Sequence, residues 1–308
     1  WGEAADISTS AGSNIRLWAQ DNWGEDLIFN TFDGTPYYWD KTLGTSARAV
    51  SFADWPAGAT SAPTVVRRMM LSGADRHVVA FGANPIGETD QDLLMVRWSD
   101  QENPFDWYPT AINTAGSQRI ASGSEIVSAQ KTRQEMLIWT DVSLHAMRFT
   151  GPPYTFTFSM LANNISILGP NAVATIGDKA FWMDRENFYV YSGRVQVIPC
   201  TLLRYVFDDI NLTQSHKCFA ASNRMFDEVF WFYASASSTD IDRYVKFNFT
   251  ENTWDLGTLA RTAWVDFGIH DNPRGCGAAS DVNYVYIQES GQNADESAMT
   301  SFIESADF

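Results

Sequence analysis

Strand-forming segments dominate this sequence, and they recur in groups along its whole length. Short stretches rich in Val, Ile, Phe, Tyr and Trp alternate with clusters of Gly, Asn, Asp and Pro, the pattern of a many-stranded antiparallel fold. Comparable positions in successive groups lie about 51 residues apart on average, at Leu27, Val78, Met136, Ala180, Val229 and Tyr284. Four-strand units at this period predict an all-β chain, a β-propeller of about six four-stranded blades.

The strands of the individual groups can be read from the pattern. The fourth group is a complete blade, with strands over 172–176, 180–183, 187–191 and 194–198. The first contains a hairpin, 27–32 and 35–40, in which the Asp33-Gly34 step supplies the positive φ angles of a tight turn. The remaining strands are predicted over 77–81, 92–98, 125–129, 136–140, 144–149, 218–221, 228–233, 242–248 and from 253, with a sixth group from Gly275 through 283–287.

The pattern leaves one alternative fold and one question about the chain ends. β-Sandwich domains also give alternating strands with frequent turn signals, so that alternative stays open, whereas the strand content excludes helical solenoids. We interpret residues 1–308 as a single propeller-like region. Because the chain begins at Trp1 and stops within the sixth group, we expect it to be an internal part of a longer chain with both ends missing.

The charge of the chain limits its partners. A formal net charge of −16 argues against binding to nucleic acid or to an anionic membrane surface, both of which attract clustered Lys and Arg. Ordinary solubility explains such a charge, and it would also suit a surface that lets a polyanion pass without sticking. The cysteines, Cys200, Cys218 and Cys276, have neither zinc-site nor disulfide spacing, and we interpret them as small apolar side chains in a reducing compartment.

No segment has the pattern of a catalytic or metal site. The carboxylates of residues 100–108 lack the central Gly and terminal Glu of a calcium loop, so we interpret the segment as a turn around Asn103-Pro104 with aromatic plugs. There is no G-x-S-x-G elbow and no phosphate-binding loop, and the histidines show no ligand spacing: His77, His145, His216 and His270. The sequence therefore predicts no catalytic, cofactor-binding or metal-binding residue and no cofactor.

Two further features bear on function. Sialidase-type propellers repeat an Asp-box, of which only the tail occurs here, at residues 252–254, so a glycosidase or a glycan-binding propeller remains the alternative function. Residues 203–209 and 261–264 mix aromatic and charged side chains, which is typical both of packing between blades and of subunit contacts.

Several stretches resemble structural proteins of tailed bacteriophages. They are IRLWAQDNWGEDLI (15–28), DGTPYYWD (33–40), RWSDQENPFDWYPT (97–110), TRQEMLIWTD (132–141), GPPYTF (151–156), ISILGPN (165–171), FWMDRENFYVY (181–191) and NFTENTW (248–254). The resemblance spans essentially the whole chain and is to the tail nozzle or hub, tail tubular protein B-like, family of short-tailed phages. These are phrases of strands and turns, so no individual functional residue is transferred.

The resemblance implies a virion protein and not an enzyme. It implies a homohexameric ring below the portal and adaptor proteins, in which genomic DNA passes through the axial channel without specific binding. The outer face of the ring would carry tail fibre or spike proteins. The location implied is the virion tail, assembled in the cytoplasm of the bacterial host, without membrane insertion by this segment.

Overall fold

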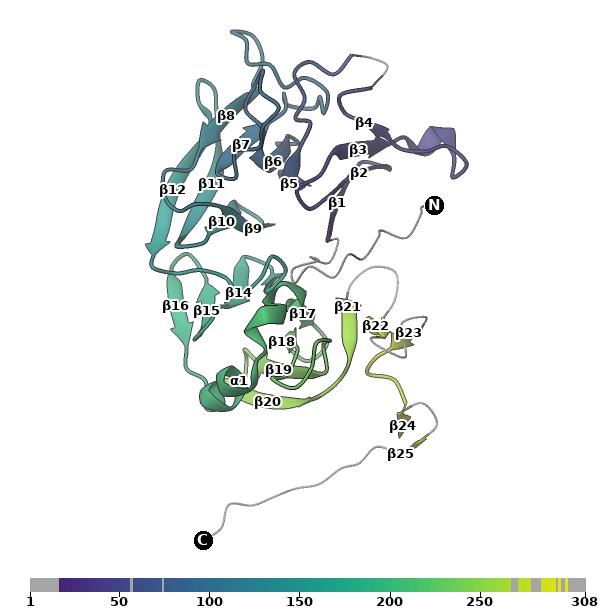
Figure 1. The fold of residues 1–308 in the computed structure, drawn as a ribbon, viewed down its shortest axis with the longest axis vertical. Helices are drawn as coiled ribbons and strands as arrows, with labels where there is room; N and C mark the ends of the chain where they lie inside the picture. Colours follow the sequence, from purple (N-terminus) through teal and green to yellow (C-terminus); the bar gives the residue numbers. More distant parts are fainter. Residues whose placement is uncertain are drawn as a thin grey trace.

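The chain folds as a six-bladed β-propeller (Figure 1). The computed structural model describes residues 17–55, 58–73, 75–266, 271–277, 284–291, 293–294 and 297–298. Within that part of the chain, five blades are four-stranded antiparallel sheets and the sixth has three strands. The blades follow one another around a common centre in chain order, and the first strand of each blade lies innermost.

The blades are built from consecutive strands without crossovers. Blades 1 to 3 are β1 (Trp18–Trp23), β2 (Asp26–Thr31), β3 (Pro36–Trp39) and β4 (Val50–Ser51); β5 (Val66–Leu71), β6 (Val78–Ala83), β7 (Met95–Trp98) and β8 (Gly116–Arg119); β9 (Ile126–Lys131), β10 (Met136–Thr140), β11 (Ser143–Gly151) and β12 (Thr155–Asn163). Blades 4 to 6 are β13 (Val173–Ile176), β14 (Lys179–Met183), β15 (Phe188–Tyr191) and β16 (Val195–Ile198); β17 (Phe219–Asn223), β18 (Glu228–Tyr233), β19 (Arg243–Asn248) and β20 (Thr253–Thr258); β21 (Arg261–Val265), β22 (Arg274–Gly277) and β23 (Val285–Ile287). A small hairpin follows, β24 (Asn293–Ala294) and β25 (Ser297–Ala298).

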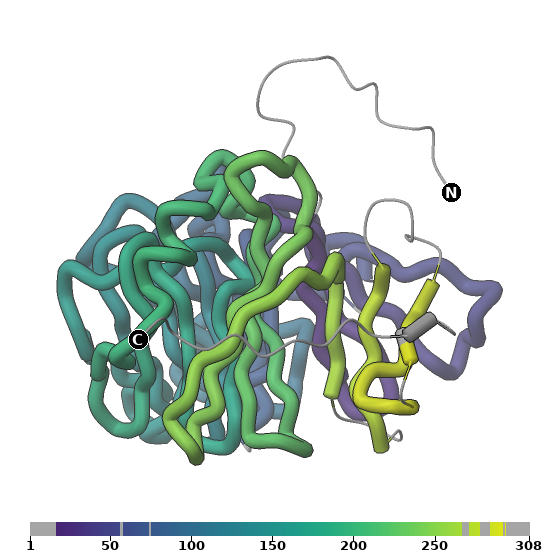
Figure 2. The backbone as a smooth tube through the Cα atoms, turned by 90° about the horizontal axis from the view of Figure 1, so that it is seen from below, coloured from purple at the N-terminus to yellow at the C-terminus, as the bar shows by residue number. Residues whose placement is uncertain are grey.

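The second strand is the most deeply buried element of blades 2, 3 and 5. Every residue of β6, β10 and β18 is buried, which explains why these segments are nearly continuous apolar runs and do not alternate. A strand covered on both faces has no solvent side to carry polar residues. In Figure 2, turned by 90°, the strands of neighbouring blades stand side by side along one direction, so each sheet packs face to face on the next.

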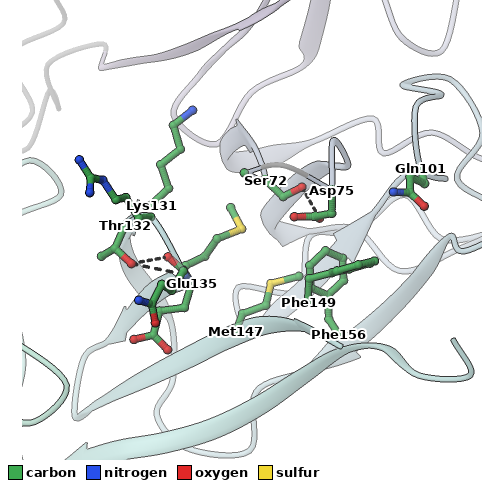
Figure 3. Close-up of a pocket in the computed structure, with 13 residues that line it drawn as sticks. Ser72, Asp75, Gln101, Lys131, Thr132, Glu135, Met147, Phe149 and Phe156 are labelled. Carbon is green, nitrogen blue, oxygen red and sulfur yellow. Dashed lines mark hydrogen bonds between the residues drawn. The ribbon is translucent and has the colours of Figure 1, made fainter. Parts of the chain in front are cut away.

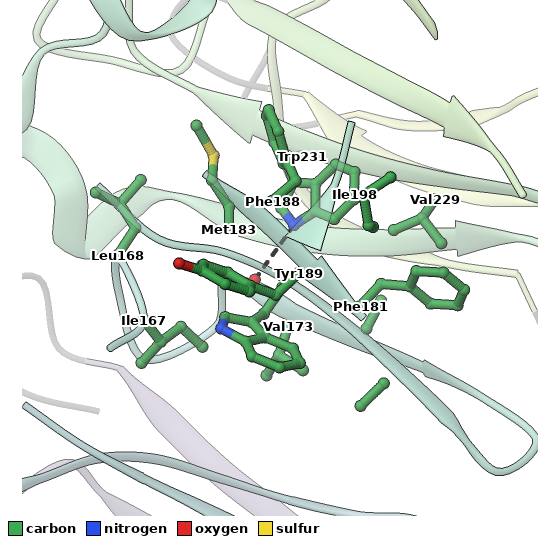
Figure 4. Packing of buried hydrophobic residues seen from close by; sticks show 14 of the residues in the cluster. Ile167, Leu168, Val173, Phe181, Met183, Phe188, Tyr189, Ile198, Val229 and Trp231 are labelled. Carbon is green, nitrogen blue, oxygen red and sulfur yellow. Dashed lines mark hydrogen bonds between the residues drawn. The ribbon is translucent and has the colours of Figure 1, made fainter. Parts of the chain in front are cut away.

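The core therefore lies between blades. The largest cluster joins blades 3, 4 and 5 and contains three fully buried indoles, Trp139, Trp182 and Trp231. Figure 4 shows Trp231 beside Phe188, with ring centroids 4.9 Å apart, and its Nε1 donates to the carbonyl of Ala172 at 3.3 Å. A buried indole N–H usually finds such a partner, whereas Nε1 of Trp139 has none among the described residues.

Other indoles repeat this contact between blades. Trp254 of β20 donates to the carbonyl of Pro199, after β16, at 2.8 Å, and Trp264 of β21 donates to the carbonyl of Ser222 in β17 at 3.0 Å. Each bond combines a large apolar surface with one directional contact to a neighbouring backbone. The tryptophans therefore set the packing of adjacent blades as well as filling the core.

The predicted turn at Asp33-Gly34 is present, but its physical basis is different. Only Asp33 has a positive φ, of 54°. Gly34 is required because a Cβ there would lie 2.1 Å from Oγ1 of Thr31. The backbone of Gly34 also pairs with Val66 at the start of blade 2, with N–O distances of 3.1 and 2.9 Å.

The predicted blade pattern is confirmed for the first five groups and wrong in detail for the sixth. Leu27, Val78, Met136, Ala180 and Val229 all lie in second strands. Tyr284 does not, because it precedes β23, the third strand of its blade. The sixth blade begins at β21 and not at Gly275, since the apolar run of β21, 263–265, is short and none of its residues is buried. Predicted residues 278–283 lie outside the described part of the chain.

The structure also decides between the two predicted folds and shows the form of residues 203–209. The β-sandwich alternative is wrong, because six small sheets surround a centre and no two large sheets pack together. Residues 203–209 form the helix α1 (Leu203–Asp209), which buries only Val206 against the blades. The short 3₁₀ segments Lys41–Leu43 and Leu212–Lys217 complete the helical content of the described residues.

Replacing Trp231 by alanine should lower the free energy of unfolding by about 3–5 kcal/mol, because it removes a fully buried indole and leaves a cavity between blades. Urea unfolding followed by fluorescence and circular dichroism would measure this loss. The matched control is Ile112→Ala, at a side chain 97% exposed, with an expected loss below about 0.5 kcal/mol. Equal losses would contradict a core located between blades.

Candidate functional site

The largest of the cavities described here opens at the end of the propeller where the inner strands begin. Its volume is about 610 Å³, and it is lined by residues at or just before the starts of β5, β9, β13 and β17 and by the β2–β3 turn. The polar side chains of its lining are Asp33, Arg67, Glu125, Asp141, Ser166, Arg185, Ser215 and His216.

Arg67 is the central group of this cavity. Its guanidinium binds Asp33 through two bonds, Nε–Oδ1 of 3.0 Å and Nη2–Oδ2 of 3.2 Å, and binds Glu125 at 2.5 Å. Burial would lower the pKa of Arg67, but the hydrogen bonds and the charges of these two carboxylates outweigh it, so the pKa is raised. Blades 1, 2 and 3 are thereby joined through one cation.

This arrangement does not suit glycoside hydrolysis. That reaction needs one carboxylic acid that donates a proton and a second carboxylate that acts at the sugar. Asp33 and Glu125 instead both accept hydrogen bonds from Arg67, so neither carboxylate is free to act on a sugar. The geometry is that of a clamp between blades.

A second cavity, of about 340 Å³, lies between the β5–β6 turn of blade 2 and the β9–β10 turn of blade 3 (Figure 3). Its apolar wall comes from Met136, Met147, Phe149 and Phe156. On its polar side Glu135 is buried, accepts from Arg148 Nε at 2.5 Å, and also accepts from the hydroxyl of Tyr191. The carboxylate of Glu135 is thus fully engaged in holding blade 3 against blade 4.

His77 lies fully buried behind this cavity in a chain of hydrogen bonds. Its Nδ1 is 2.9 Å from Oδ2 of Asp75, and its Nε2 is 3.0 Å from Oγ1 of Thr114. The Thr114 hydroxyl also donates to Asp100 at 2.7 Å and accepts from the backbone N–H of Gln101 at 2.9 Å. Carboxylate, imidazole and hydroxyl therefore occur in the order of a nucleophilic triad.

The hydrogen bonds of this chain differ from those of a triad. The Thr114 hydroxyl donates to Asp100 and accepts from the backbone N–H of Gln101, so its oxygen is not free to act as a nucleophile. The His77 ring is fully buried between Asp75 and Thr114 and joins them. The cluster is a structural lock between the long β7–β8 loop and the start of β6.

The aspartates of the lock are held in the ionised form. Burial would raise the pKa of Asp75, but hydrogen bonds from His77 and Ser72 outweigh it and lower the pKa. The pKa of Asp100 is lowered in the same way, chiefly by hydrogen bonds from Thr114 that exceed the effect of burial. A general acid needs the opposite shift.

A third cavity lies at the centre of the ring. It has a volume of about 240 Å³ and is lined from the inner strands of blades 2 to 6 by Arg68, Gln130, Asn171, Val173, Phe219, Ala220, Thr262, Ala263 and Trp264. Arg68 crosses this centre, because its Nη1 donates to Ser128 Oγ and to the Pro170 carbonyl, both at 3.1 Å. Its Nη2 donates to Asn171 Oδ1, also at 3.1 Å.

The segment over 100–108 is a turn, as predicted. Trp107 is fully buried, and Phe105 stacks on Trp55 with ring centroids 4.4 Å apart. Within the described part of the chain, no group of three or more His, Cys, Asp and Glu side chains is arranged to hold a metal ion.

The other polar residues noted in the sequence are scattered. His145 lies buried in β11, where burial lowers its pKa, and His216 lines the largest cavity. Cys218 is buried as predicted, whereas Cys200 and Cys276 are only partly buried. His270 lies outside the described residues.

The two aromatic segments pack between blades, one of the two roles that the sequence left open. Trp264 lies against Phe230 and Phe232 of blade 5, with centroid distances of 5.5 and 5.7 Å. In α1, Phe207 packs on Phe188 of blade 4, while Tyr205 remains exposed and accepts from Arg243.

Sequence reasoning missed Arg67 and Arg68, although a signal was present. The stretch VVRRMML (65–71) places two adjacent arginines inside an apolar strand. Arginine is almost never buried without a partner, so such a pair marks a position where charge must be compensated. The partners of the pair come from other blades and are invisible in the local sequence.

No family model matches the chain, and no curated protein matches it. Similar solved structures include Hsv2 of Kluyvelomyces marxianus, with 8% identity, a TM-score of 0.45 and coverage of 93% of this chain and 78% of that one. SapL1 lectin in complex with alpha methyl fucoside has 9% identity, a TM-score of 0.45 and coverage of 90% and 96%. A fungal alcohol oxidase of the AA5 family, in complex with copper, has 9% identity, a TM-score of 0.48 and coverage of 87% and 60%. At these values the similarities carry no argument about function.

Among the described residues, no helix has the length and apolar character needed to cross a bilayer.

Replacing Arg67 by methionine should lower the free energy of unfolding by about 1–3 kcal/mol, since it breaks charged hydrogen bonds that are partly open to solvent. Arg67→Lys should recover only part of this loss, because an ammonium cannot form the two-bond contact with Asp33. The control is Arg119→Met, which breaks the exposed ion pair with Asp92 and should cost less than about 1 kcal/mol. Chemical denaturation of all three variants would measure these values.

The lowered pKa values of Asp75 and Asp100 predict a stability that depends on pH. Their contribution is fully present above the unfolded-state pKa of about 3.9 and is lost as pH falls through the lower folded-state values. Asp75→Asn should therefore lower stability at pH 7 and flatten its loss between about pH 5 and pH 2. Ser72→Ala, which removes one hydrogen bond to Asp75, should give an intermediate curve in urea titrations. Parallel curves for all three proteins would show that Asp75 contributes nothing to acid unfolding.

Proposed function

We propose that this chain is a structural component of the tail nozzle or hub of a short-tailed bacteriophage. In that role it forms an oligomeric ring, a homohexamer, that continues the DNA-ejection channel below the portal and adaptor proteins and carries tail fibres or spikes. The observation that carries the proposal is the sequence resemblance to this phage family along the whole chain. The propeller fold is compatible with a rigid, assembled module.

The stretches that resemble phage tail proteins include strands and buried loops of the propeller. Residues 181–191 end β14 and form β15, and residues 97–110 contain the loop that buries Trp107. Residues 165–171 pack closely on the segment before blade 5, where a Cβ at Gly169 would lie 2.4 Å from the carbonyl oxygen of Ser215. A resemblance in such segments supports a shared scaffold more than a shared chemical site.

The centre of one propeller is too narrow for DNA. Arg68 ties blades 2, 3 and 4 together across it, and the central cavity of about 240 Å³ has room for roughly eight water molecules. The major groove of duplex DNA alone is about 12 Å wide. A channel for the genome must therefore lie between copies of the chain, which is what a ring supplies.

The longest hairpin among the described residues is the best candidate for a contact between copies. β11 and β12 have nine residues each, and the hairpin exposes Phe149, Tyr154 and Met160 to 40%, 76% and 50%. Exposed aromatic and Met side chains are enriched at interfaces between proteins. The net charge of −16 would limit adhesion of DNA to the channel that such a ring encloses.

The proposal predicts that the full-length protein assembles into a ring of six copies. Light scattering and electron microscopy of the purified protein measure this directly. Met160→Glu should shift the population from rings toward monomers by placing a charge in the contact. Ser159→Glu is the matched control, because the adjacent residue of the strand faces the opposite side and should leave the rings intact.

Two results would overturn the proposal. One is a protein that stays monomeric at all concentrations and is absent from the tail when antibodies are used to label virions. The other is a specific response on a glycan array or turnover of a glycan, which would favour the carbohydrate-binding or glycosidase alternative.

A further inference from the structure

The central cavity contains a cation without a matching anion. Arg68 lies on β5 directly after Arg67, and because successive side chains of a strand point in opposite directions the two arginines reach different surroundings. Arg67 finds two carboxylates. Arg68 finds only neutral acceptors, namely the Ser128 hydroxyl, the Pro170 carbonyl and the Asn171 amide oxygen.

The surroundings of Arg68 disfavour its charge. Desolvation lowers its pKa to about 10, which still leaves it charged at neutral pH. Among the described residues, no carboxylate forms an ion pair with it. Arg68 is only partly exposed to solvent, and a cation with restricted access to water gains from an accompanying anion.

Some N–H groups of the Arg68 guanidinium make no hydrogen bond within the described structure. It has five N–H groups, of which the three contacts use two on Nη1 and one on Nη2. Within the described structure, Nε–H and the second Nη2–H have no acceptor. The side-chain amide of Gln130, on β9, lines the same cavity and likewise has no partner in that part of the chain.

We propose that the central cavity binds a small oxyanion, with Arg68 as its principal ligand. Two N–H donors of one guanidinium are the arrangement in which arginine grips a carboxylate or phosphate, and the Gln130 amide supplies a further donor. A volume of about 240 Å³ admits a small free anion, whereas the three bonds from Arg68 to blades 3 and 4 keep larger molecules from threading through the centre. The anion would tie the inner strands of the propeller together, independently of any ring that the chain forms.

Binding can be tested with inorganic phosphate and acetate as probes, compared with sodium chloride at the same ionic strength. The full chain should bind one of the two oxyanions saturably, with a Kd in or below about the millimolar range by calorimetry, and its Tm should rise with the same concentration dependence. Phosphate and acetate separate the two chemical sources of an oxyanion. Absence of saturable binding for both would overturn the proposal.

Variants separate a built site from a general salt effect. Arg68→Gln should abolish saturable binding, and Arg68→Lys, which keeps the charge but loses the paired donors, should weaken it at least tenfold. Arg133→Gln is the control, since this exposed arginine lines the second cavity and should bind as the unmodified chain does. Equal Tm shifts in the unmodified chain and in Arg68→Gln would show that the anion acts only through bulk solvent.

A measurement on the unmodified chain covers the case in which Arg68→Gln fails to fold. Crystals soaked in selenate should give an anomalous selenium peak within hydrogen-bond reach of Arg68 and Gln130. A peak elsewhere, or none, would overturn the site. Neither result bears on ring formation, so the failure of this proposal and the failure of the nozzle proposal can be told apart.

Discussion

The packing of one blade on the next is the interaction on which the rest of this structure depends. No single sheet here is large enough to bury its own apolar face, and the second strands β6, β10 and β18 are buried only because a neighbouring blade covers each side. Tryptophans provide much of this contact, since the indoles of Trp231, Trp254 and Trp264 each pack on an adjacent blade and donate to its backbone. Stability is consequently a property of the assembled ring of sheets.

The polar clusters also hold the blades together, because each one joins segments that are far apart in the chain. Arg67 connects blades 1, 2 and 3 through Asp33 and Glu125. His77 holds the β7–β8 loop through Thr114, and the engagement of the Thr114 hydroxyl by Asp100 makes the cluster a lock and not a catalytic triad. Charged groups that elsewhere perform acid–base chemistry are engaged here in ion pairs and hydrogen bonds between elements.

Most of the cavities described here are lined by polar side chains that join one blade to another. We propose the role of tail nozzle from the sequence resemblance. Because the centre of one propeller is too narrow for DNA, the proposed DNA path lies between copies of the chain. The central cavity around Arg68 is the exception, since among the described residues this cation has no carboxylate partner and two of its N–H donors have no acceptor. Arg67 is paired with two carboxylates and joins blades, whereas Arg68 has no carboxylate partner among the described residues and is the proposed anion ligand.

The sequence by itself determined the fold class, the number of blades and most second strands, because apolar runs bounded by turn residues are local signals that repeat. It also identified the Asp33-Gly34 turn and the structural character of residues 100–108. It placed the sixth blade too late, since β21 has only a short apolar run and no buried residue. Only the tertiary structure decided which charges are paired. Arg67 and Arg68 are neighbours in sequence, but their hydrogen-bond partners lie 34 to 103 residues away in the chain. The closed arrangement of blades within one propeller brings these partners together.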